Sequence, residues 1–116
     1  MFKKASWEKV SGTCLQGYIY EDYDRLVEVF GIEHSEGDGY KVDAEWIIEF
    51  DDGTVATIYN WKNGRNYCGG DGLDVEAITD WHIGGRSKRA VELVQAVLDN
   101  VIVGECVDVT DQKLLG

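Results

Sequence analysis

The segment from Trp81 to Lys88 combines residue types that bind anions. Its sequence is Trp-His-Ile-Gly-Gly-Arg-Ser-Lys, and it stands directly before an apolar run with helical spacing. A helix N-terminus binds anions through its free N–H groups and the positive end of its dipole. Cations are otherwise unfavourable there, so Arg86, Lys88 and the following Arg89 favour a phosphate or an acidic neighbour at this point. The segment is not a Walker motif, because G-x-x-x-x-G-K-[ST] is absent.

Two tryptophans extend this hypothesis to a ligand pocket. Trp61 and Trp81 flank the glycine-rich segment 63–77, and a planar ligand could stack between their rings. The alternative is that the rings pack in the core, as we expect for Trp46 and Tyr59, and that the cations form ordinary surface pairs. The residues of this candidate site for an anionic nucleotide are Trp61, Trp81, His82, Gly84, Gly85, Arg86, Ser87 and Lys88.

Acid–base catalysis would need one of the two histidines, His34 and His82, or a carboxyl group with a shifted pKa. Asp80 and His82 lie two residues apart, so a strand places them on the same face. The competing interpretation is a hydrogen-bonded histidine at the sheet surface. The nucleophile motif G-x-S-x-G is absent, and Ser87 has no identifiable base. We therefore predict no catalytic residues, no enzyme activity and no cofactor.

Metal sites and disulfides are equally disfavoured. Four carboxylates crowd glycine-rich stretches, as ligands of hard cations do, but the twelve-residue spacing of a calcium loop is missing. These carboxylates are Asp38, Asp71, Asp74 and Glu76. The cysteines Cys14, Cys68 and Cys106 are far apart and form no C-x-x-C pair. We predict neither a metal site nor a disulfide scaffold.

Negative charge is concentrated in the middle of this 116-residue chain, whose formal net charge is −11. Residues 21–80 carry sixteen acidic side chains and four basic ones, whereas the rest of the chain carries six acidic and seven basic ones. A field of one sign attracts oppositely charged partners and repels nucleic acids and anionic membranes. We therefore expect no direct binding to nucleic acid or membrane. A purely solubilising role of the charge is the alternative.

The sharper hypothesis is an acidic face that docks on a basic surface of a host protein. Its acids lie in a predicted helix, in the loop after it and in the following strand. They are Asp22, Asp24, Glu28, Glu33, Glu36, Asp38, Asp43, Glu45 and Glu49. Asp24 and Glu28 are four residues apart and therefore share the solvent side of the helix. The sequence leaves the oligomeric state open.

The first half of the chain holds a predicted strand and a predicted helix. Residues 13–20 are rich in β-formers and precede an acidic pair, which is typical of a strand. In residues 22–30 apolar positions recur at helical spacing, and Gly31 stands where glycine ends a helix. Residues 33–39 lack apolar side chains and read as an exposed loop. Residues 3–11 fit a short helix or an irregular arm.

A β-hairpin is the strongest local signal. Two β-rich runs in residues 41–62 flank Asp51-Asp52-Gly53-Thr54, and Asp-Gly favours a type I′ turn. With Asp52 and Gly53 as the two loop residues, alternation fixes the pairing. One large apolar face then carries Phe50, Val55, Ile48, Thr57, Trp46, Tyr59, Ala44 and Trp61. The opposite, mainly solvated face carries Glu49, Ala56, Ile47, Ile58, Glu45, Asn60, Asp43 and Lys62.

The second half begins with a long connection. Residues 63–77 are rich in glycine and predict a mobile loop that binds something or lacks order. Residues 78–83 predict a further strand. Ser87 is expected to cap a helix of about fifteen residues whose apolar side covers the sheet. Residues 102–109 allow an edge strand, and residues 110–116 form a polar tail.

The element order β-α-β-β-β-α predicts a single α+β domain, residues 1–116. We expect an antiparallel sheet of four to five strands with both helices on one face. No apolar run approaches the length of a membrane span, and the N-terminus lacks the apolar stretch of a signal peptide. The sequence therefore predicts a soluble, cytoplasmic protein.

Two resemblances add to this pattern. The element order in residues 12–62, with a tryptophan-bearing hairpin, resembles the small binding modules of the β-lactamase inhibitor and outer-membrane assembly lipoprotein families. The phrases Val-Asp-Ala-Glu-Trp, Asp-Gly-Thr-Val-Ala-Thr-Ile-Tyr-Asn-Trp-Lys and Trp-His-Ile-Gly-Gly resemble a group of small bacteriophage-encoded proteins, over residues 12–101. The second resemblance implies a phage accessory protein and carries no catalytic residues. It places the expected partner in a host cell, for example in a defence nuclease or CRISPR complex that the protein would inhibit as a DNA mimic.

Overall fold

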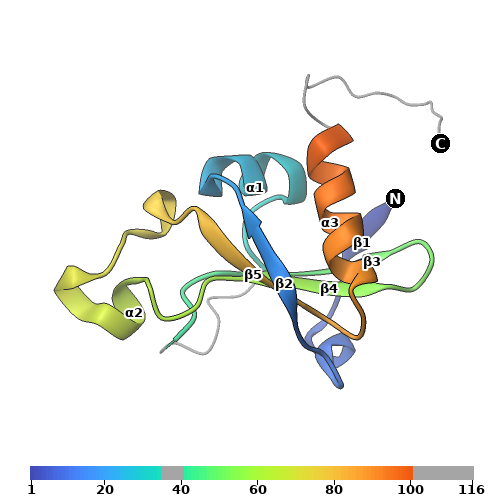
Figure 1. The fold of residues 1–116 in the computed structure, drawn as a ribbon, viewed down its shortest axis with the longest axis horizontal. Coiled ribbons are helices and arrows are strands. Elements are labelled where there is room, and N and C mark those ends of the chain that lie inside the picture. Colours follow the sequence, from blue (N-terminus) through green and yellow to red (C-terminus); the bar gives the residue numbers. More distant parts are fainter. Residues whose placement is uncertain (35–40, 101–116) are drawn as a thin grey trace.

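The protein folds around a five-stranded antiparallel sheet with the strand order β1-β3-β4-β5-β2. The computed structural model describes residues 1–34 and 41–100 (Figure 1). The strands are β1 (Phe2–Lys4), β2 (Cys14–Tyr20), β3 (Glu45–Phe50), β4 (Val55–Tyr59) and β5 (Asp80–Gly85). The α-helices are α1 (Tyr23–Phe30), α2 (Arg65–Cys68) and α3 (Arg89–Asn100), and the 3₁₀ turns are η1 (Trp7–Val10), η2 (Gly69–Asp71) and η3 (Val75–Ala77). The predicted α+β class is confirmed, with β1 as an additional strand.

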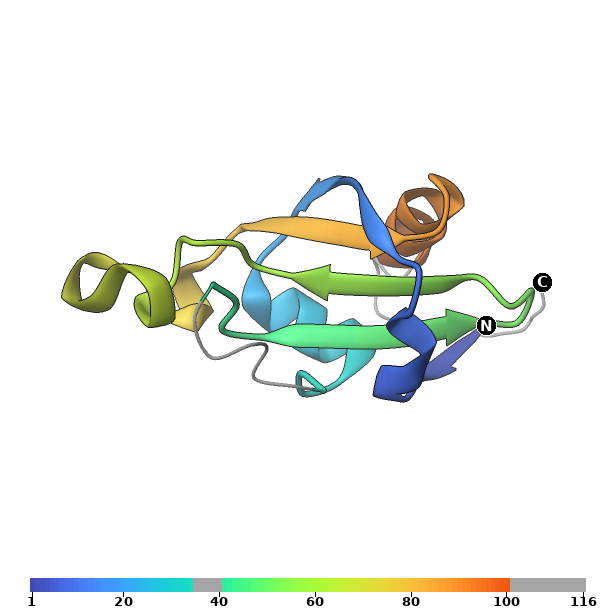
Figure 2. The same ribbon diagram turned by 90° about the horizontal axis from the view of Figure 1, so that it is seen from below.

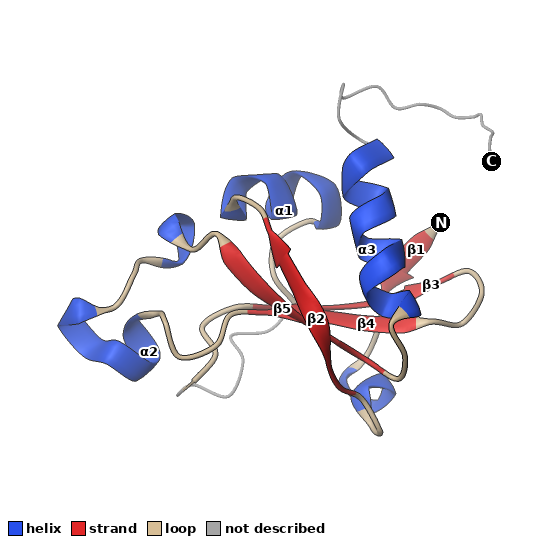
Figure 3. Cartoon of the chain, in the orientation of Figure 1, coloured by secondary structure: helices blue, strands red, loops and turns tan. Residues whose placement is uncertain are grey.

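The two longer helices cover one face of the sheet. Figures 1 and 3 show α1 and α3 on the same side of the strands and η1 on the opposite side. Figure 2 views the sheet from the side of η1, with β3 and β4 in front of α1. We term the side that carries Trp46 and Trp81 the helix face, and the side that carries Tyr59 and His82 the open face. The helix face is therefore covered by α1 and α3, whereas the open face is covered only in part: Ile47, Val55 and Thr57 are buried there, but Tyr18 and Trp61 are exposed.

The core lies between the helix face and the two helices. Trp46 on β3 and Trp81 on β5 are fully buried, and their rings meet edge to face with centroids 5.4 Å apart. Trp81 Nε1 donates to the carbonyl oxygen of Glu21 at 2.9 Å, and Trp46 Nε1 donates to that of Gly31 at 2.8 Å. These carbonyls lie just before and just after α1, so the two buried indoles satisfy their N–H groups and fix both ends of that helix. The helices contribute Leu26, Phe30, Ala90, Val94 and Leu98 to this core.

The helix boundaries follow the predicted signals. Asp22 occupies the N-cap position of α1. At the other end Gly31 has a φ of 89°, a left-handed conformation that glycine adopts without strain, and its N–H donates to the carbonyl oxygen of Val27. The hydroxyl of Ser87 accepts a hydrogen bond from the N–H of Arg89 at 3.3 Å, as expected for a cap of α3. Local sequence rules thus place both helices correctly.

The predicted hairpin register is wrong by one residue. Trp46 pairs with Ile58 rather than with Tyr59. The loop has three residues, because the N–H of Gly53 donates to the carbonyl oxygen of Phe50 at 2.8 Å and Gly53 itself has a φ of 89°. This is the pattern of a type I turn followed by a left-handed glycine, which competes with the two-residue type I′ turn for the same Asp-Gly sequence.

The shift exchanges the two faces of β4, since a slip of one residue moves every side chain to the other side of a strand. Ala56 and Ile58, expected on the solvated face, are fully buried on the helix face. Thr57 and Tyr59, expected in the core beside Trp46, lie on the open face. The prediction of Trp46 as a core residue is confirmed, and that of Tyr59 is wrong.

The connection between β4 and β5 holds more regular structure than its glycine content indicates. Residues 63–77 contain α2, η2 and η3, and Gly64 forms an isolated bridge with Leu73. Arg65 Nε donates to Asp74 Oδ1 at 2.7 Å, and both side chains are exposed. The segment therefore folds back on itself at the end of the sheet, as Figure 1 shows around α2.

Both edges of the sheet are short or irregular. At one edge β1 pairs with β3 over only three residues. At the other edge the pairing of β2 with β5 shifts between Leu15 and Gly17, and Lys88 Nζ donates to the carbonyl oxygen of Gln16 at 2.8 Å. The predicted edge strand 102–109 and the polar tail 110–116 lie outside the described residues.

Candidate functional site

The acids of α1 face solvent. Asp22, Asp24 and Glu28 are exposed, and Asp24 and Glu28 share the outer side of the helix as predicted. Glu28 Oε1 lies 3.5 Å from Arg25 Nη1, and Arg25 Nη2 donates to the carbonyl oxygen of Leu98 at 2.8 Å. Asp22 and Asp24 have no ion-pair partner within residues 1–34 and 41–100. Part of the charge on this helix is therefore uncompensated.

Acids from separate elements converge on Tyr23. Its hydroxyl donates to Glu33 Oε1 at 2.6 Å. Burial first, and then the hydrogen bond and charge of Glu33, raise the pKa of Tyr23 to about 12. The charges of Glu76 and Asp24 act in the same direction. We term the acids around this point the acidic surface; they are the exposed Asp22, Asp24, Asp74 and Glu76 and the half-buried Glu33.

Asp43 has a structural role instead of a free carboxylate. The buried side chain of Asn60 donates to Asp43 Oδ1 at 2.8 Å, and the N–H of Asn66 donates to Asp43 Oδ2 at 3.1 Å. In return, Asn60 Oδ1 accepts from the N–H groups of Asp43 and Ala44 at 2.7 and 3.2 Å. Every polar group of the buried amide is thus satisfied, and Asp43 ties the start of β3 to the segment after β4.

The remaining predicted acids do not join the acidic surface. Glu45 and Glu49 point to the open face, on the other side of the sheet from α1. Glu49 Oε1 pairs with Lys9 Nζ at 3.6 Å. Glu36 and Asp38 lie outside the described residues. The single acidic face expected from the sequence is therefore divided, because alternate residues of β3 point to opposite faces.

The cations before α3 have protein partners. Arg86 Nη2 donates to the carbonyl oxygens of Lys9 and Ser11, each at 2.8 Å. Lys88 Nζ donates to the backbone of the edge strand β2. Arg89 Nε pairs with Asp52 Oδ2 at 2.7 Å. These contacts fasten the chain before β2 and the hairpin loop to the start of α3, and they match the alternative of ordinary structural pairs.

The predicted pocket between Trp61 and Trp81 is wrong. Trp81 is fully buried on the helix face, whereas Trp61 is 40% exposed and its ring lies 6.3 Å from that of His82 on the open face. The same alternation along β5 separates Gly84 from Gly85, which faces Ala90 of α3. The eight residues of the candidate nucleotide site therefore do not line one cavity.

Both histidines have structural contacts. His34 Nδ1 accepts a hydrogen bond from the N–H of Ile47 at 2.9 Å. His82 lies among aromatic rings: its ring centroid is 4.8 Å from that of Tyr18 and 5.5 Å from that of Tyr59. Burial lowers the pKa of both imidazoles, and the charge of Asp80 partly opposes this effect at His82. Both rings are therefore held neutral near pH 7.

The structure brings together no metal ligands in its described part: residues 1–34 and 41–100 contain no group of three histidine, cysteine or carboxylate side chains arranged around a common point. Asp74 is paired with Arg65, which lowers the pKa of its carboxyl group. Cys14 and Cys68 are exposed free thiols. Asp38 and Cys106 lie outside the described residues.

An aromatic cluster stands on the open face, and the sequence analysis did not identify it. It consists of Tyr18 on β2, Tyr59 on β4, His82 on β5, and Trp61, the second residue after β4. The rings of Tyr59 and Trp61 are nearly perpendicular, with an interplanar angle of 77° and centroids 6.3 Å apart. Alternating aromatic residues at 59 and 61 could have signalled the cluster, but the wrong register assigned them to the core.

A hollow of about 380 Å³ opens beside this cluster. Its walls include the rings of Trp7, Tyr59 and Trp61, with Glu45 on β3. Its floor contains Thr57 and Gly84, which are neighbours across β4 and β5. We term this the open-face hollow, lined also by Val10, Thr13, Cys14 and Val42.

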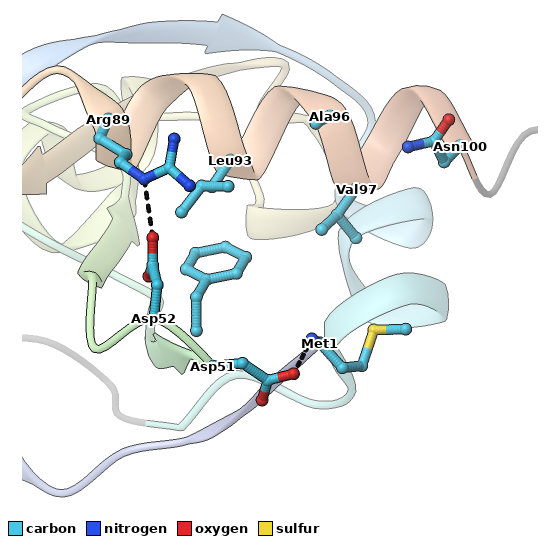
Figure 4. A pocket seen from close by; sticks show the side chains of 9 residues that line it. Met1, Asp51, Asp52, Arg89, Leu93, Ala96, Val97 and Asn100 are labelled. Carbon is cyan, nitrogen blue, oxygen red and sulfur yellow. Dashed lines mark hydrogen bonds and ion pairs between the residues drawn. The ribbon is translucent and has the colours of Figure 1, made fainter. Parts of the chain in front are cut away.

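A second groove lies between α3 and the hairpin loop (Figure 4). Figure 4 shows Leu93, Ala96, Val97 and Asn100 along the helix, while ion pairs join Arg89 to Asp52 and the amino group of Met1 to Asp51. Its volume is about 370 Å³. Its charged groups are paired with one another, so it offers an apolar lining without a polar anchor.

Comparison with known proteins adds no identification: no protein-family model and no curated protein matches this sequence. Among the described helices, none is long and apolar enough to cross a membrane. Inference about function therefore depends on the residues and their geometry.

Proposed function

We propose that this chain is a non-catalytic binding protein whose acidic surface docks on a basic, nucleic-acid-binding surface of another protein. The observation that carries the proposal is that Glu33, Asp74 and Glu76 line one surface depression, in which Glu33 accepts the hydrogen bond from the Tyr23 hydroxyl. The like charges of these acids repel one another in the free protein. A basic partner that neutralises them recovers that energy and is steered towards the surface over long range.

The distribution of ion pairs supports the same partner. Some acids away from the acidic surface pair with nearby cations, as in the Lys9–Glu49 and Arg89–Asp52 pairs. At the acidic surface Asp74 has Arg65, but Asp24 and Glu76 have no ion-pair partner within the described residues. These two carboxylates are therefore available to cations of a basic partner.

The resemblance to small phage-encoded proteins supplies a biological setting for this proposal. A phage protein with such a surface would act in the bacterial cytoplasm and inhibit a host protein by occupying the site that holds DNA or RNA. A defence nuclease or a CRISPR complex has a surface of this kind. The structural contacts of His34 and His82 favour binding over catalysis as the function.

The test is capture of proteins from a bacterial lysate on the immobilised chain, with duplex DNA as competitor. We expect captured proteins to bind nucleic acid on their own, to be released by DNA, and to associate more slowly as salt increases. The double variant Asp24→Lys with Glu76→Lys should lose capture.

A matched control variant changes the net charge by the same amount, but at residues outside the acidic surface. Glu8 and Glu92 are exposed on η1 and α3, outside the acidic surface, so Glu8→Lys with Glu92→Lys should retain capture. If both double variants lose capture equally, total charge alone is responsible and the proposed surface is wrong. Capture that DNA does not reverse would equally contradict the proposal.

A further inference from the structure

We propose that the open-face hollow is a binding site for an arginine side chain of a protein partner. The proposal rests on the proposed function in expecting a basic partner, but it concerns the opposite face of the sheet and a different kind of contact. Three features of the hollow support it: aromatic walls, a polar atom without a partner in its floor, and a carboxylate in its lining.

The walls present π-faces to a planar cation. Tyr59 and Trp61 meet nearly at right angles, and Trp7, which is 66% exposed, lines the same hollow. A guanidinium group stacks on such faces by cation–π attraction and stays charged at any physiological pH. The ring of Trp61 already attracts cations in the free protein, since Lys41 Nζ and Lys62 Nζ lie 5.5 and 5.8 Å from its centroid.

The floor holds a buried hydroxyl group without a hydrogen-bond partner. Thr57 is only 3% exposed, and its hydroxyl oxygen has no partner within residues 1–34 and 41–100. A buried polar group left unpaired costs free energy, which a ligand recovers when it supplies the missing hydrogen bond. Gly84 makes room for this hydroxyl: a Cβ atom at residue 84 would lie 2.5 Å from Thr57 Oγ1. A guanidinium N–H is a donor that Thr57 Oγ1 can accept.

One carboxylate lines the hollow, that of Glu45. The charge of Glu45 contributes, after burial, to raising the pKa of the Tyr59 hydroxyl in the same wall. A carboxylate beside aromatic faces fits a fork of N–H donors on a planar group, which distinguishes arginine from the compact ammonium of lysine. The apolar lining by Val10 and Val42 suits the three methylene groups of the arginine stem.

The probe is the peptide acetyl-Gly-Gly-Arg-Gly-Gly-amide, titrated into the ¹⁵N-labelled chain. The reference peptide carries citrulline, a neutral isostere of arginine, at the same position. We expect saturable shifts of the Trp7 and Trp61 indole N–H signals and of the Thr57 and Gly84 amides. The citrulline peptide should bind about tenfold more weakly, since it lacks the charge for cation–π and carboxylate contacts.

Substitutions inside and outside the hollow test whether the arginine peptide binds there. Thr57→Val removes the hydroxyl group at nearly constant volume and should weaken arginine binding about fivefold while the fold is kept. Trp61→Leu should weaken it further. The matched control is Tyr20→Leu, since Tyr20 is an aromatic residue on β2 that is 80% exposed and lies outside the hollow lining; it should leave the affinity unchanged.

Equal binding of the two peptides, no saturable shift with the arginine peptide, or equal losses in Trp61→Leu and Tyr20→Leu would each overturn the proposal. The Asp24→Lys, Glu76→Lys variant separates it from the proposed function. Because its substitutions lie beyond the sheet from the hollow, peptide binding should persist in that variant even though docking on a basic surface is lost.

Discussion

Tryptophan side chains have different surroundings on the two faces of the sheet. Trp81 on the helix face is fully buried, packs against Trp46, and donates its N–H group to a backbone carbonyl. Trp61 on the open face is 40% exposed and contacts ring edges and lysine ammonium groups. The two indole N–H groups of the helix face have backbone partners, whereas the open face retains exposed rings and the hydroxyl of Thr57, which has no hydrogen-bond partner among residues 1–34 and 41–100.

This difference indicates that the helix face mainly stabilises the fold, whereas the open face keeps groups that can bind a partner. A fully packed face contributes to the free energy of folding and has nothing further to offer a partner. An incompletely satisfied face contributes less to folding, and it keeps interactions that only a ligand can complete. The comparison therefore predicts large stability effects at buried positions of the helix face and small ones at the exposed positions of the open face.

The largest expected effect is at Trp46. Because Trp46 is fully buried and its indole N–H holds the end of α1, Trp46→Ala should lower the free energy of unfolding by about 3–5 kcal/mol. Glu45→Ala, next to it on the open face, should have an effect within about 0.5 kcal/mol. Urea unfolding of the two variants provides the measurement. Similar losses for both would mean that the faces of β3 are not as described.

The second effect tests the register of β4. Ile58 is fully buried on the helix face, so Ile58→Ala should cost about 2–5 kcal/mol. Tyr59→Leu, which keeps an apolar side chain on the open face, should cost less than half as much. The two-residue hairpin loop would place Tyr59 in the core and Ile58 outside it. If urea unfolding shows a larger loss of stability for Tyr59→Leu than for Ile58→Ala, the two-residue loop and its register are correct instead.

The smallest effect concerns the histidines, which lie away from the helix face. Burial lowers the pKa of His34 and His82 below the usual value near 6.5. As the pH falls below about 6.5, the unfolded chain binds protons that the native histidines do not, so stability decreases. Protonation of His34 Nδ1 would also break its bond from the N–H of Ile47.

Thermal unfolding between pH 7.5 and 5.5 measures this effect. The melting temperature should decrease over this range, and His34→Asn should reduce the decrease. Carboxylates contribute little in this window, because the pKa of Asp52 is lowered to about 2, chiefly by the N–H group of Thr54, and the pKa of Asp74 is also lowered. A melting temperature that is constant or rises towards pH 5.5 would contradict the assignment of neutral histidines.

Local sequence rules predicted the elements better than their mutual arrangement. The glycine stop at Gly31 and the cap at Ser87 depend on neighbouring residues, and both are observed. The hairpin register depends on a choice between two loop types that Asp-Gly serves almost equally well. Ala56 and Ile58 alternate with Thr57 and Tyr59, and both sets contain β-formers, so the hydrophobic pattern did not settle the choice.

The prediction of a ligand site between Trp61 and Trp81 was wrong for the same reason. The pairing of Trp61 with Trp81 was inferred from their position around one loop, whereas the faces of β4 and β5 decide where each ring points. Long-range contacts, such as those of Arg86 with the carbonyls of Lys9 and Ser11, leave no signal in neighbouring residues. Of the nine acids predicted to form one face, only Asp22, Asp24 and Glu33 belong to the acidic surface, while its other two members, Asp74 and Glu76, were considered only as ligands of a hard cation.

The irregular edges of the sheet have a consequence for behaviour at high concentration. A long, flat edge strand is a template on which a second chain can add a strand and begin to aggregate. Here β1 offers only three residues, and β2 is bent by its bulge while Lys88 occupies one of its backbone carbonyls. With a net charge of −11 on every copy, a protein built this way should stay dispersed even when it is abundant in a crowded cell.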